Sequence, residues 1–543
     1  MRIPNLLAAL SVGLVLAACG AMAGDSGAAY AEGDTSGGWG YDAAAEAGGW
    51  EPGDDNADTT APDTYYEEPE QEFAFNSAAV GETVVFVVDT NRDQLLWIDA
   101  ATLRIRAVKV GDGPVLVKAF PGTDSALVLN QGSQTASLID IVDGRAEVRH
   151  FDVLPGVNTV AMSPYGPYAV LYYQWAPGGT TLGTLNAVNV LRAETGKQSM
   201  IEVGTGFKPS AVAFRQDGGA LYVTSQAGLT RVDLPGDVDA PKFRAPLPLV
   251  DDPLLDQYER EVLVTADGAY ALTRVIGQPV VSVLDLASHA VRSFSSADGS
   301  IPSDLDLVPG RASFLLMLRD SRRVQLIDTA GLLAGDTGSV REVGTGDVPL
   351  GLADVAADGS RALLYTTAAG VKTVGVLDLK VDPLELSFLP LAKTVRSAVI
   401  EPRSEFGVLY HDRAPGALSP NDTLEEQVAK SDGYSVIDLA SGYVQPFLTD
   451  HEPKDLVFLP EQQKMIVLVP DPSNLDHRVH VVDFTTMLPS SLPLYARPLS
   501  VQAFKDQPTA VILEEHLSGR LTILDTDTKG TESVTGFHLN AEE

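Results

Sequence analysis

Residues 203–234 read VGTGFKPSAVAFRQDGGALYVTSQAGLTRVDL, and most of the chain repeats this plan. A first apolar run ends at Asp217, Gly218-Gly219 supply a tight turn, and a second run, ALYVTS, occupies 220–225. A third run ends on Asp233, which aliphatic residues flank. Short runs rich in β-branched and aromatic residues, separated by glycine turns, are typical of β-strands joined as hairpins. This stretch therefore predicts an antiparallel sheet.

The acidic residue that ends the third run recurs along the chain. Its ten positions are Asp99, Asp140, Asn189, Asp233, Asp285, Asp328, Asp378, Asp438, Asp483 and Asp525, and neighbouring copies lie 41 to 60 residues apart. A period in the forties built of short strands predicts the four-stranded blades of a β-propeller. Ten copies fit one wide ring or two smaller rings, and the absence of a linker rich in proline and glycine near the middle favours one ring. A residue repeated in every blade is expected to be structural, accepting backbone N–H groups of the turn that follows.

Within the blade of residues 203–234, the fourth strand is expected at 242–249, and the long insertion at 411–433 is expected inside a later blade. The series VG-x-G-x-P, an apolar strand, an Asp-Gly type of turn, LYVTS and a third strand ending in Asp resembles the YVTN family of surface-layer β-propeller repeats. The resemblance covers residues 73–543. It implies an all-β propeller of four-stranded blades, and it implies function only weakly because propellers carry many unrelated activities.

The N-terminus has the features of a lipoprotein signal peptide. Arg2 precedes an apolar stretch that is too short to span a bilayer and ends in Leu16-Ala17-Ala18-Cys19. This ending resembles the lipobox of bacterial lipoproteins, in which the cysteine sulfur takes a diacylglycerol and the chain is cut before it. We therefore expect residues 1–18 to be a signal peptide and Cys19 to be the lipid anchor. Because Gly20, rather than Asp, follows Cys19, the outer membrane is the expected location, with the protein facing the periplasm or the cell surface.

Residues 19–72 are expected to form a disordered tether between the anchor and the propeller at 73–543. From Gly20 to Glu72 there are 14 acidic side chains and no Lys or Arg, and large aliphatic residues are missing. Such a segment cannot bury enough apolar surface to offset the entropy of ordering it.

Charge and cysteine content exclude several classes of function. Residues 73–543 carry 59 acidic and 37 basic side chains, so the basic surface that nucleic acid requires is missing. Cys19 is the only cysteine, which excludes an intramolecular disulfide and any cysteine-based metal site. The sequence also lacks the usual hydrolase, zinc-protease and nucleotide-binding motifs. We therefore predict no catalytic residues, no metal site and no cofactor.

Polar residues follow the second strand of most blades. In a propeller these positions gather on one face around the channel, where ligands usually bind. The predicted binding rim consists of Asp89, Asn91, Arg92, Gln174, Trp175, Arg274, Arg319, Asp320, Arg322, His411, Asp412, Arg413, Glu515 and His516.

Two functions fit these observations. The first is a membrane-anchored binding or scaffold module that presents the propeller to a protein or glycan. The second is a lactonase-like hydrolase with a site in the central channel, as in some of the wider kin of the YVTN family. The missing catalytic motifs favour the first.

Overall fold

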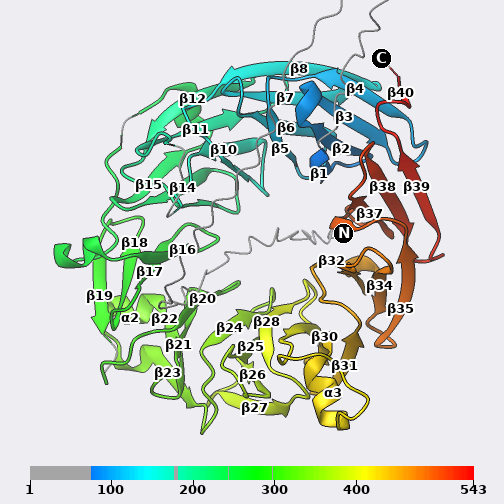
Figure 1. The fold of residues 1–543 in the computed structure, drawn as a ribbon. Coiled ribbons are helices and arrows are strands. Elements are labelled where there is room, and N and C mark those ends of the chain that lie inside the picture. The colour runs from blue at the N-terminus through cyan, green and yellow to red at the C-terminus, as the bar shows by residue number, and fades with distance from the viewer. Residues whose placement is uncertain (1–74, 177–181, 243, 296–297, 543) are drawn as a thin grey trace, which may run out of the picture. The chain divides into compact units, whose positions relative to one another are not determined.

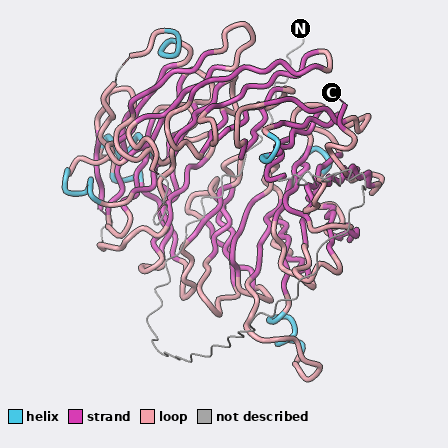
Figure 2. The backbone as a smooth tube through the Cα atoms, turned by 45° about the horizontal axis from the view of Figure 1, so that its top comes forward, coloured by secondary structure: helices cyan, strands magenta, loops and turns pink. Residues whose placement is uncertain are grey.

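The computed structural model describes residues 75–176, 182–242, 244–295 and 298–542. These residues form ten antiparallel sheets that follow one another around a ring in the order of the sequence (Figure 1). Strands dominate throughout and the helices are short (Figure 2). The predicted β-propeller is confirmed, and of the two arrangements that the repeat count allowed it is the single ring that forms.

Each sheet is one blade, whose strands run outward from the centre in sequence order. Blades 1 to 5 consist of β1 (Phe75–Val80), β2 (Val84–Asp89), β3 (Gln94–Asp99) and β4 (Ile105–Lys109); β5 (Pro114–Ala119), β6 (Ser125–Asn130), β7 (Thr135–Val142) and β8 (Arg145–Asp152); β9 (Thr159–Met162), β10 (Tyr168–Tyr172), β11 (Ala187–Arg192) and β12 (Ser199–Gly204); β13 (Ala211–Phe214), β14 (Ala220–Ser225) and β15 (Gly228–Asp233); and β16 (Arg260–Val264), β17 (Tyr270–Val275), β18 (Val280–Asp285) and β19 (Val291–Ser295).

Blades 6 to 10 continue with β20 (Asp304–Val308), β21 (Ser313–Leu318), β22 (Arg323–Asp328) and β23 (Val340–Gly344); β24 (Leu352–Val355), β25 (Arg361–Tyr365), β26 (Thr373–Asp378) and β27 (Glu385–Pro390); β28 (Val395–Ile400), β29 (Phe406–His411), β30 (Asp432–Asp438) and β31 (Val444–Thr449); β32 (Asp455–Leu459), β33 (Lys464–Val469), β34 (His477–Asp483) and β35 (Leu488–Leu494); and β36 (Pro498–Ala503), β37 (Thr509–Glu514), β38 (Arg520–Asp525) and β39 (Thr531–Thr535). A last strand is β40 (Ala541–Glu542), and the helices are α1 (Gly236–Asp239), α2 (Thr329–Ala334), α3 (Leu424–Lys430), η1 (Thr90–Arg92), η2 (Pro253–Gln257), η3 (Thr337–Ser339) and η4 (Pro460–Gln462).

The core lies between the blades. Second strands such as β2 and β14 are buried at every position, because both faces of each sheet pack against a neighbouring sheet. Ten clusters of buried apolar side chains result, and each joins two consecutive blades. The tenth interface joins blade 10 to blade 1, so the series of contacts has no break at which two smaller rings could separate.

Two features close the ring. β40 pairs in parallel with β4 of blade 1, with Ala541 opposite Ile105. Nearer the centre, the side-chain amide of Gln502 in β36 accepts from the N–H of Val80 (3.1 Å) and donates to the carbonyl of Ala78 (2.9 Å). The C-terminal strand and an inner-strand amide therefore fasten the last blade to the first.

The predicted fourth strand of blade 4, at 242–249, is wrong. The described residues of this segment make one bridge to β15, in which Leu247 and Leu229 exchange both backbone hydrogen bonds (2.8 and 2.9 Å). Pro246 and Pro248 flank the bridge and have no N–H to donate, so they cannot extend a ladder.

The long insertion lies inside blade 8, between β29 and β30, as expected. It carries α3, which begins with a capping box made by Thr423 and Glu426. The buried ammonium group of Lys393 donates to the carbonyls of Val428, Ala429 and Ser431 at 2.7–3.0 Å. A cation at the C-terminal end of the helix complements its dipole and satisfies its last carbonyls.

The acidic residue that ends each third strand has the predicted structural role in most blades. The Asp285 carboxylate accepts the N–H groups of Ala287 and Ser288, both at 2.9 Å. Turn amides bind in the same way to Asp99, Asp328, Asp378, Asp438, Asp483 and Asp525. In two blades the partner differs: Ser125 donates to Asp140, and Arg231 and Arg244 bind Asp233. In blade 3 the prediction is wrong, because Asn189 is the third residue of β11 and Arg192 ends that strand. The Asn189 side chain accepts the N–H of Leu154 in the linker from blade 2.

Replacing Asp285 by alanine is expected to lower the local free energy of unfolding by about 1–2 kcal/mol, because two turn N–H groups lose their acceptor. Hydrogen exchange of the β18 and β19 amides measures this loss. Asp285→Asn keeps an acceptor oxygen and should retain most of the stability. Equal losses in both variants would show that the turn bonds do not carry the effect.

The predicted signal peptide, Cys19 and the tether 19–72 lie outside the described residues. Within the part of the chain that the structure describes, no helix is long and apolar enough to cross a membrane.

Candidate binding face and inner wall

One edge of the ring carries two kinds of connection. Because neighbouring strands are antiparallel, the turn from second to third strand and the segment that joins one blade to the next lie at the same end of each sheet. We call this edge the linker face. Connecting loops held by a rigid scaffold are where binding residues usually lie.

All residues of the predicted rim lie on the linker face. Asp89, Asn91 and Arg92 end or follow β2; Gln174 and Trp175 follow β10; Arg274 lies near the end of β17; Arg319, Asp320 and Arg322 follow β21; His411, Asp412 and Arg413 end or follow β29; and Glu515 and His516 follow β37.

Two of these residues are buried and hold the loops together. The Asp89 side chain is fully buried, accepts the N–H of Asn91 (3.1 Å) and pairs with His538. His411 is 5% exposed and bonds the carbonyl of Thr394 (3.0 Å) and the hydroxyl of Ser435 (2.6 Å). Burial lowers the pKa of His411 to about 4, so the ring is neutral at physiological pH.

Three arginines of the rim also bind within the protein. Arg274 donates to Glu261 (2.7 Å) and to the carbonyl of Pro302 (3.1 Å). Arg322 donates to the carbonyl of Asp347 (2.6 Å), and Arg413 pairs with Asp432 (3.4 Å). Arg274 and Arg322 thus bind the linkers beside them, and Arg413 joins the insertion of blade 8 to the start of β30, so these guanidinium groups contribute to loop order.

An aromatic ledge stands on the linker face of blades 3 and 4. Trp175 and Phe207 are 43% and 47% exposed, and the ammonium group of Lys208 lies 3.7 Å from the Trp175 ring centroid and 5.3 Å from that of Phe207. The Asn158 side chain holds the backbone of Gln174, accepting its N–H (2.8 Å) and donating to its carbonyl (3.0 Å). Exposed aromatic rings beside a cation and amides suit recognition of a protein or a sugar.

Large apolar side chains are exposed at many other points of this face. Within the described residues they are Trp175, Leu182, Phe207, Leu254, Tyr258, Ile276, Ile301, Leu418, Leu424, Leu475, Tyr495, Leu517 and Leu539. The exposed apolar side chains of the opposite edge and outer strands are fewer, as with Val142, Tyr443 and Leu488. Apolar groups gathered on one polar-rimmed face mark interaction sites.

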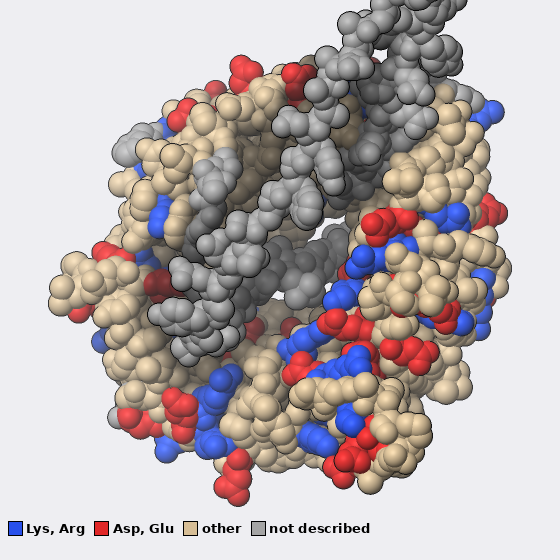
Figure 3. Space-filling model, viewed as in Figure 1, with Lys and Arg blue, Asp and Glu red and all other residues tan. Residues whose placement is uncertain are grey.

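A group of carboxylates on the inner wall was not predicted. Asp304 and Asp306 lie in β20 and Asp354 in β24, near Glu261 and Arg274. Figure 3 shows charges of both signs along the inner border of the ring. Burial raises the pKa of Asp304 to about 6, with a contribution from Glu261, and raises the pKa of Asp354 to about 6. The sequence does contain a sign of these carboxylates: the inner strands DLDLV and LADV are apolar except for their acidic residues.

Two of these carboxylates connect neighbouring blades. Asp304 accepts the N–H of Ala353 in the next inner strand (2.8 Å), and Asp354 accepts that of Ile400 in the strand after it. Asp455 does the same for Val501 (2.9 Å). We call these contacts inner-strand latches. They explain why the wall carries half-buried acids, and they assign Asp304 and Asp354 a structural role.

Asp306 has no such contact. Its Oδ2 atom is buried and has no hydrogen-bond partner among the described residues. Burial and the nearby carboxylates of Asp304 and Asp354 raise its pKa well above the ordinary value. Unlike the latches, this side chain makes no evident contribution to stability.

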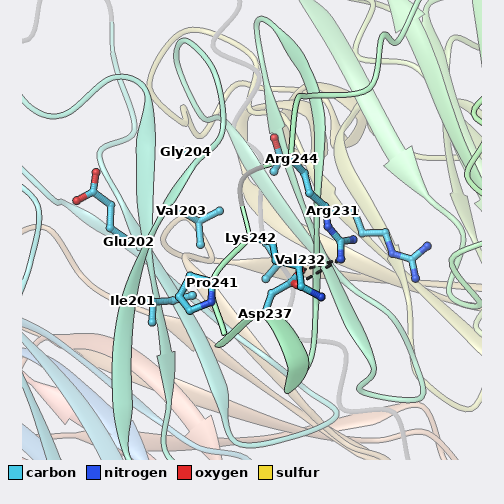
Figure 4. A pocket seen from close by; sticks show the side chains of 11 residues that line it. Ile201, Glu202, Val203, Gly204, Arg231, Val232, Asp237, Pro241, Lys242 and Arg244 are labelled. Carbon is cyan, nitrogen blue, oxygen red and sulfur yellow. Dashed lines mark hydrogen bonds and ion pairs between the residues drawn. The ribbon is translucent and has the colours of Figure 1, made fainter. Parts of the chain in front are cut away.

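A pocket of about 150 Å³ lies where blade 4 lacks its fourth strand (Figure 4). It is lined by residues of β12 and β15 together with Asp237, Pro241, Lys242 and Arg244. Arg244 donates to Asp233 (2.6 Å) and lies 3.2 Å from Asp237, so the charges beside the pocket are largely paired with one another. Within the described part of the chain, no group of three or more His, Cys, Asp or Glu residues is placed to hold a metal ion.

No protein-family model matches the chain, and no curated protein is found to match it. Solved structures are similar at low identity. Dihydro-heme d1 dehydrogenase NirN in complex with DHE is 15% identical, with a TM-score of 0.40 over 66% of this chain and 74% of that one. AztD from Citrobacter koseri is 14% identical, with a TM-score of 0.38 over 68% and 94%. These similarities concern the fold alone, and membership of the YVTN family stays a prediction from the repeats.

Proposed function

We propose that this chain is a membrane-anchored β-propeller of the cell envelope that binds a protein or glycan through its linker face. The observation that carries the proposal is the concentration of exposed apolar and aromatic side chains on that face, supplied by most blades. Internal ion pairs and buried hydrogen bonds hold these loops in place. A rigid face with aromatic and apolar groups binds a partner at a low entropic cost.

The ledge formed by Trp175, Phe207 and Lys208 is the strongest candidate contact. Its rings are exposed, its cation lies against them, and Asn158 fixes the loop beneath. Anchored aromatic side chains of this kind dominate the energetics of many interfaces. The apolar loops of other blades extend the contact beyond the size of a single small ligand.

The anchor is proposed from the sequence. The lipobox-like ending at Cys19, the acidic segment behind it and Gly20 after it support a lipoprotein of the outer membrane with a flexible tether. The sequence motif of the repeats supports membership of the YVTN family of propellers. With this acidic surface, attachment is expected to depend on the acyl chains rather than on attraction to anionic lipid.

Cys19→Ala is expected to abolish lipidation and cleavage before residue 19. The variant should keep its signal peptide and run as a heavier precursor, because cleavage in lipoproteins requires the modified cysteine. Membrane fractionation and the mass of the N-terminal peptide measure both effects. If Cys19→Ala matures to the same mass as the native protein, the proposed anchor is wrong. Recovery of the native protein in the inner-membrane fraction would contradict only the proposed location.

A further inference from the structure

Four neighbouring turns at the end of the ring carry one strongly exposed apolar side chain each. They are Leu475 between β33 and β34 (87% exposed), Tyr495 between β35 and β36 (87%), Leu517 between β37 and β38 (89%) and Leu539 between β39 and β40 (84%). We call them the leucine–tyrosine patch. All four lie on the linker face of blades 9 and 10.

Backbone contacts hold these turns side by side. The N–H of Glu515, two residues before Leu517, donates to the carbonyl of Arg497, two residues after Tyr495 (2.7 Å). The N–H of Phe537, two residues before Leu539, donates to the carbonyl of Ser518 (2.9 Å). The turns are thus tied into one surface.

The turn of Leu475 belongs to the same surface through its strands. His477 of β34 pairs with Leu494 of β35, so Leu475 and Tyr495 extend from the same end of one hairpin. The guanidinium carbon of Arg520 lies 5.5 Å from the Tyr495 ring centroid, which links this turn to β38.

The charges around the patch are matched. Arg478 pairs with Asp476 (2.8 Å), Arg497 with Glu515 (3.7 Å) and Arg520 with Glu514 (3.2 Å). Because each cation has a carboxylate beside it, the surroundings have no strong net charge. Protruding apolar tips, a tyrosine and a balanced polar rim suit the interface of a zwitterionic bilayer, where amphipathic rings and short apolar insertions are stable.

The chain enters the ring beside this patch. Phe75, the first residue described, pairs with Asp89 at the end of β2, so it lies on the linker face of blade 1. Asp89 contacts His538, the neighbour of Leu539 in sequence. A segment anchored at Cys19 therefore joins the ring next to the patch, and this favours the anchoring bilayer as the occupant over a second protein.

We propose that the leucine–tyrosine patch inserts into the lipid–water interface of the membrane that anchors the chain. This inference rests on the proposed lipid anchor. Insertion of the patch tilts the ring, so that blades 9, 10 and 1 lie closest to the membrane. The aromatic ledge belongs to blades 3 and 4, beyond blade 2, and is left accessible to a partner.

The test uses the full lipidated chain, whose only cysteine is the acylated Cys19. A cysteine introduced as Leu517→Cys is then the single free thiol and accepts an environment-sensitive dye. Leu488→Cys is the matched control, because Leu488 is 63% exposed and begins β35 at the opposite edge. The protein is reconstituted into phosphatidylcholine vesicles that contain a lipid carrying a nitroxide quencher on its acyl chain.

We expect quenching by the nitroxide lipid to be at least threefold stronger at position 517 than at 488, with a blue shift at 517 only. Adding Leu475→Ser and Tyr495→Ser should reduce quenching at 517 to the control level. Equal quenching at both positions overturns the proposal, as does a blue shift at 517 that requires a second protein instead of lipid. Two labelled thiols per chain would instead show that Cys19 is not acylated, which is a failure of the anchor and not of the patch.

Discussion

Phe537→Ala is expected to lower the free energy of opening the ring by about 3–5 kcal/mol, the usual loss for a buried phenylalanine. Phe537 is fully buried in the cluster that joins blade 10 to blade 1, together with side chains such as Val85 and Leu521. Gly519 makes room for it: this residue has φ of 78°, and a Cβ atom there would come within 2.2 Å of the Phe537 ring. Removing the ring leaves a cavity where the first and last blades meet.

Hydrogen exchange of the amides in β4 and β39 measures this opening, because local unfolding at the seam exposes them before the other blades. Leu539→Ala is the matched control, since Leu539 is two residues away and 84% exposed. A loss spread evenly over all blades, or none at the seam, would contradict closure by the C-terminal segment.

The inner-wall acids are expected to make the protein more stable at pH 5 than at pH 7.5. Burial raises the pKa of Asp304 and Asp354 to about 6, against about 3.9 in an unfolded chain, and it raises the pKa of Asp306 as well. Between pH 4 and 6 the folded state therefore binds protons that the unfolded state does not, and stability rises as the pH falls through this window. Below pH 4 the gain is complete.

The turn aspartates act in the opposite direction. Turn N–H groups, led by that of Ser288, lower the pKa of Asp285, and Asp525 is affected similarly through Thr528. Their contribution is present above pH 4 and is lost as the pH falls below the unfolded pKa toward the folded one. His411 also opposes the inner-wall acids, because burial lowers its pKa to about 4 and its neutral form loses stability as the pH falls below about 6.5. The net gain toward pH 5 is therefore smaller than the acids alone would give.

Asp306→Asn isolates the unpaired acid. The variant is expected to be more stable than the native protein by about 1–3 kcal/mol at pH 7.5, because it removes a charge that burial and the carboxylates of Asp304 and Asp354 disfavour. The difference should shrink as the pH falls, because burial and the neighbouring carboxylates raise the pKa of Asp306 and favour its neutral form. Asp320→Asn, which changes an exposed carboxyl of the same blade, should do neither. A destabilised Asp306→Asn at pH 7.5 would show that this carboxylate has a partner or function that needs its charge.

Much of the fold could be predicted from the sequence because most blades repeat the same pattern of apolar runs, glycine turns and an acidic residue. The acidic residue near the end of the third strand marks every blade except blade 3, where Asn189 lies in the middle of β11 and Arg192 ends the strand. Glycine turns and apolar runs then locate the other strands. The prediction failed at 242–249. The apolar residues of this segment suggested a strand, but Pro246 and Pro248 have no N–H groups with which to pair.

Less of the candidate site could be predicted. The rim residues lie on the expected face. The sequence around them did not show that Asp89 and His411 are buried, or that Arg274 binds Glu261. Asp89 is buried against His538 of the C-terminal segment, far away in sequence, and His411 and Arg274 bind residues in or beside their own blade that no repeat motif marks. The latches at Asp304 and Asp354 were missed for the same reason, because a backbone N–H of the next blade has no signature in the sequence.

Site-specific photo-crosslinking in living cells tests the central claim, binding through the linker face, most directly. A benzophenone amino acid replaces Phe207 on the linker face, which is 47% exposed, or Tyr443 at the opposite edge, which is 54% exposed. We expect discrete crosslinked adducts to a protein or glycan from position 207 and none from 443. Adducts from position 443 alone, or the same adducts from both positions, would contradict it.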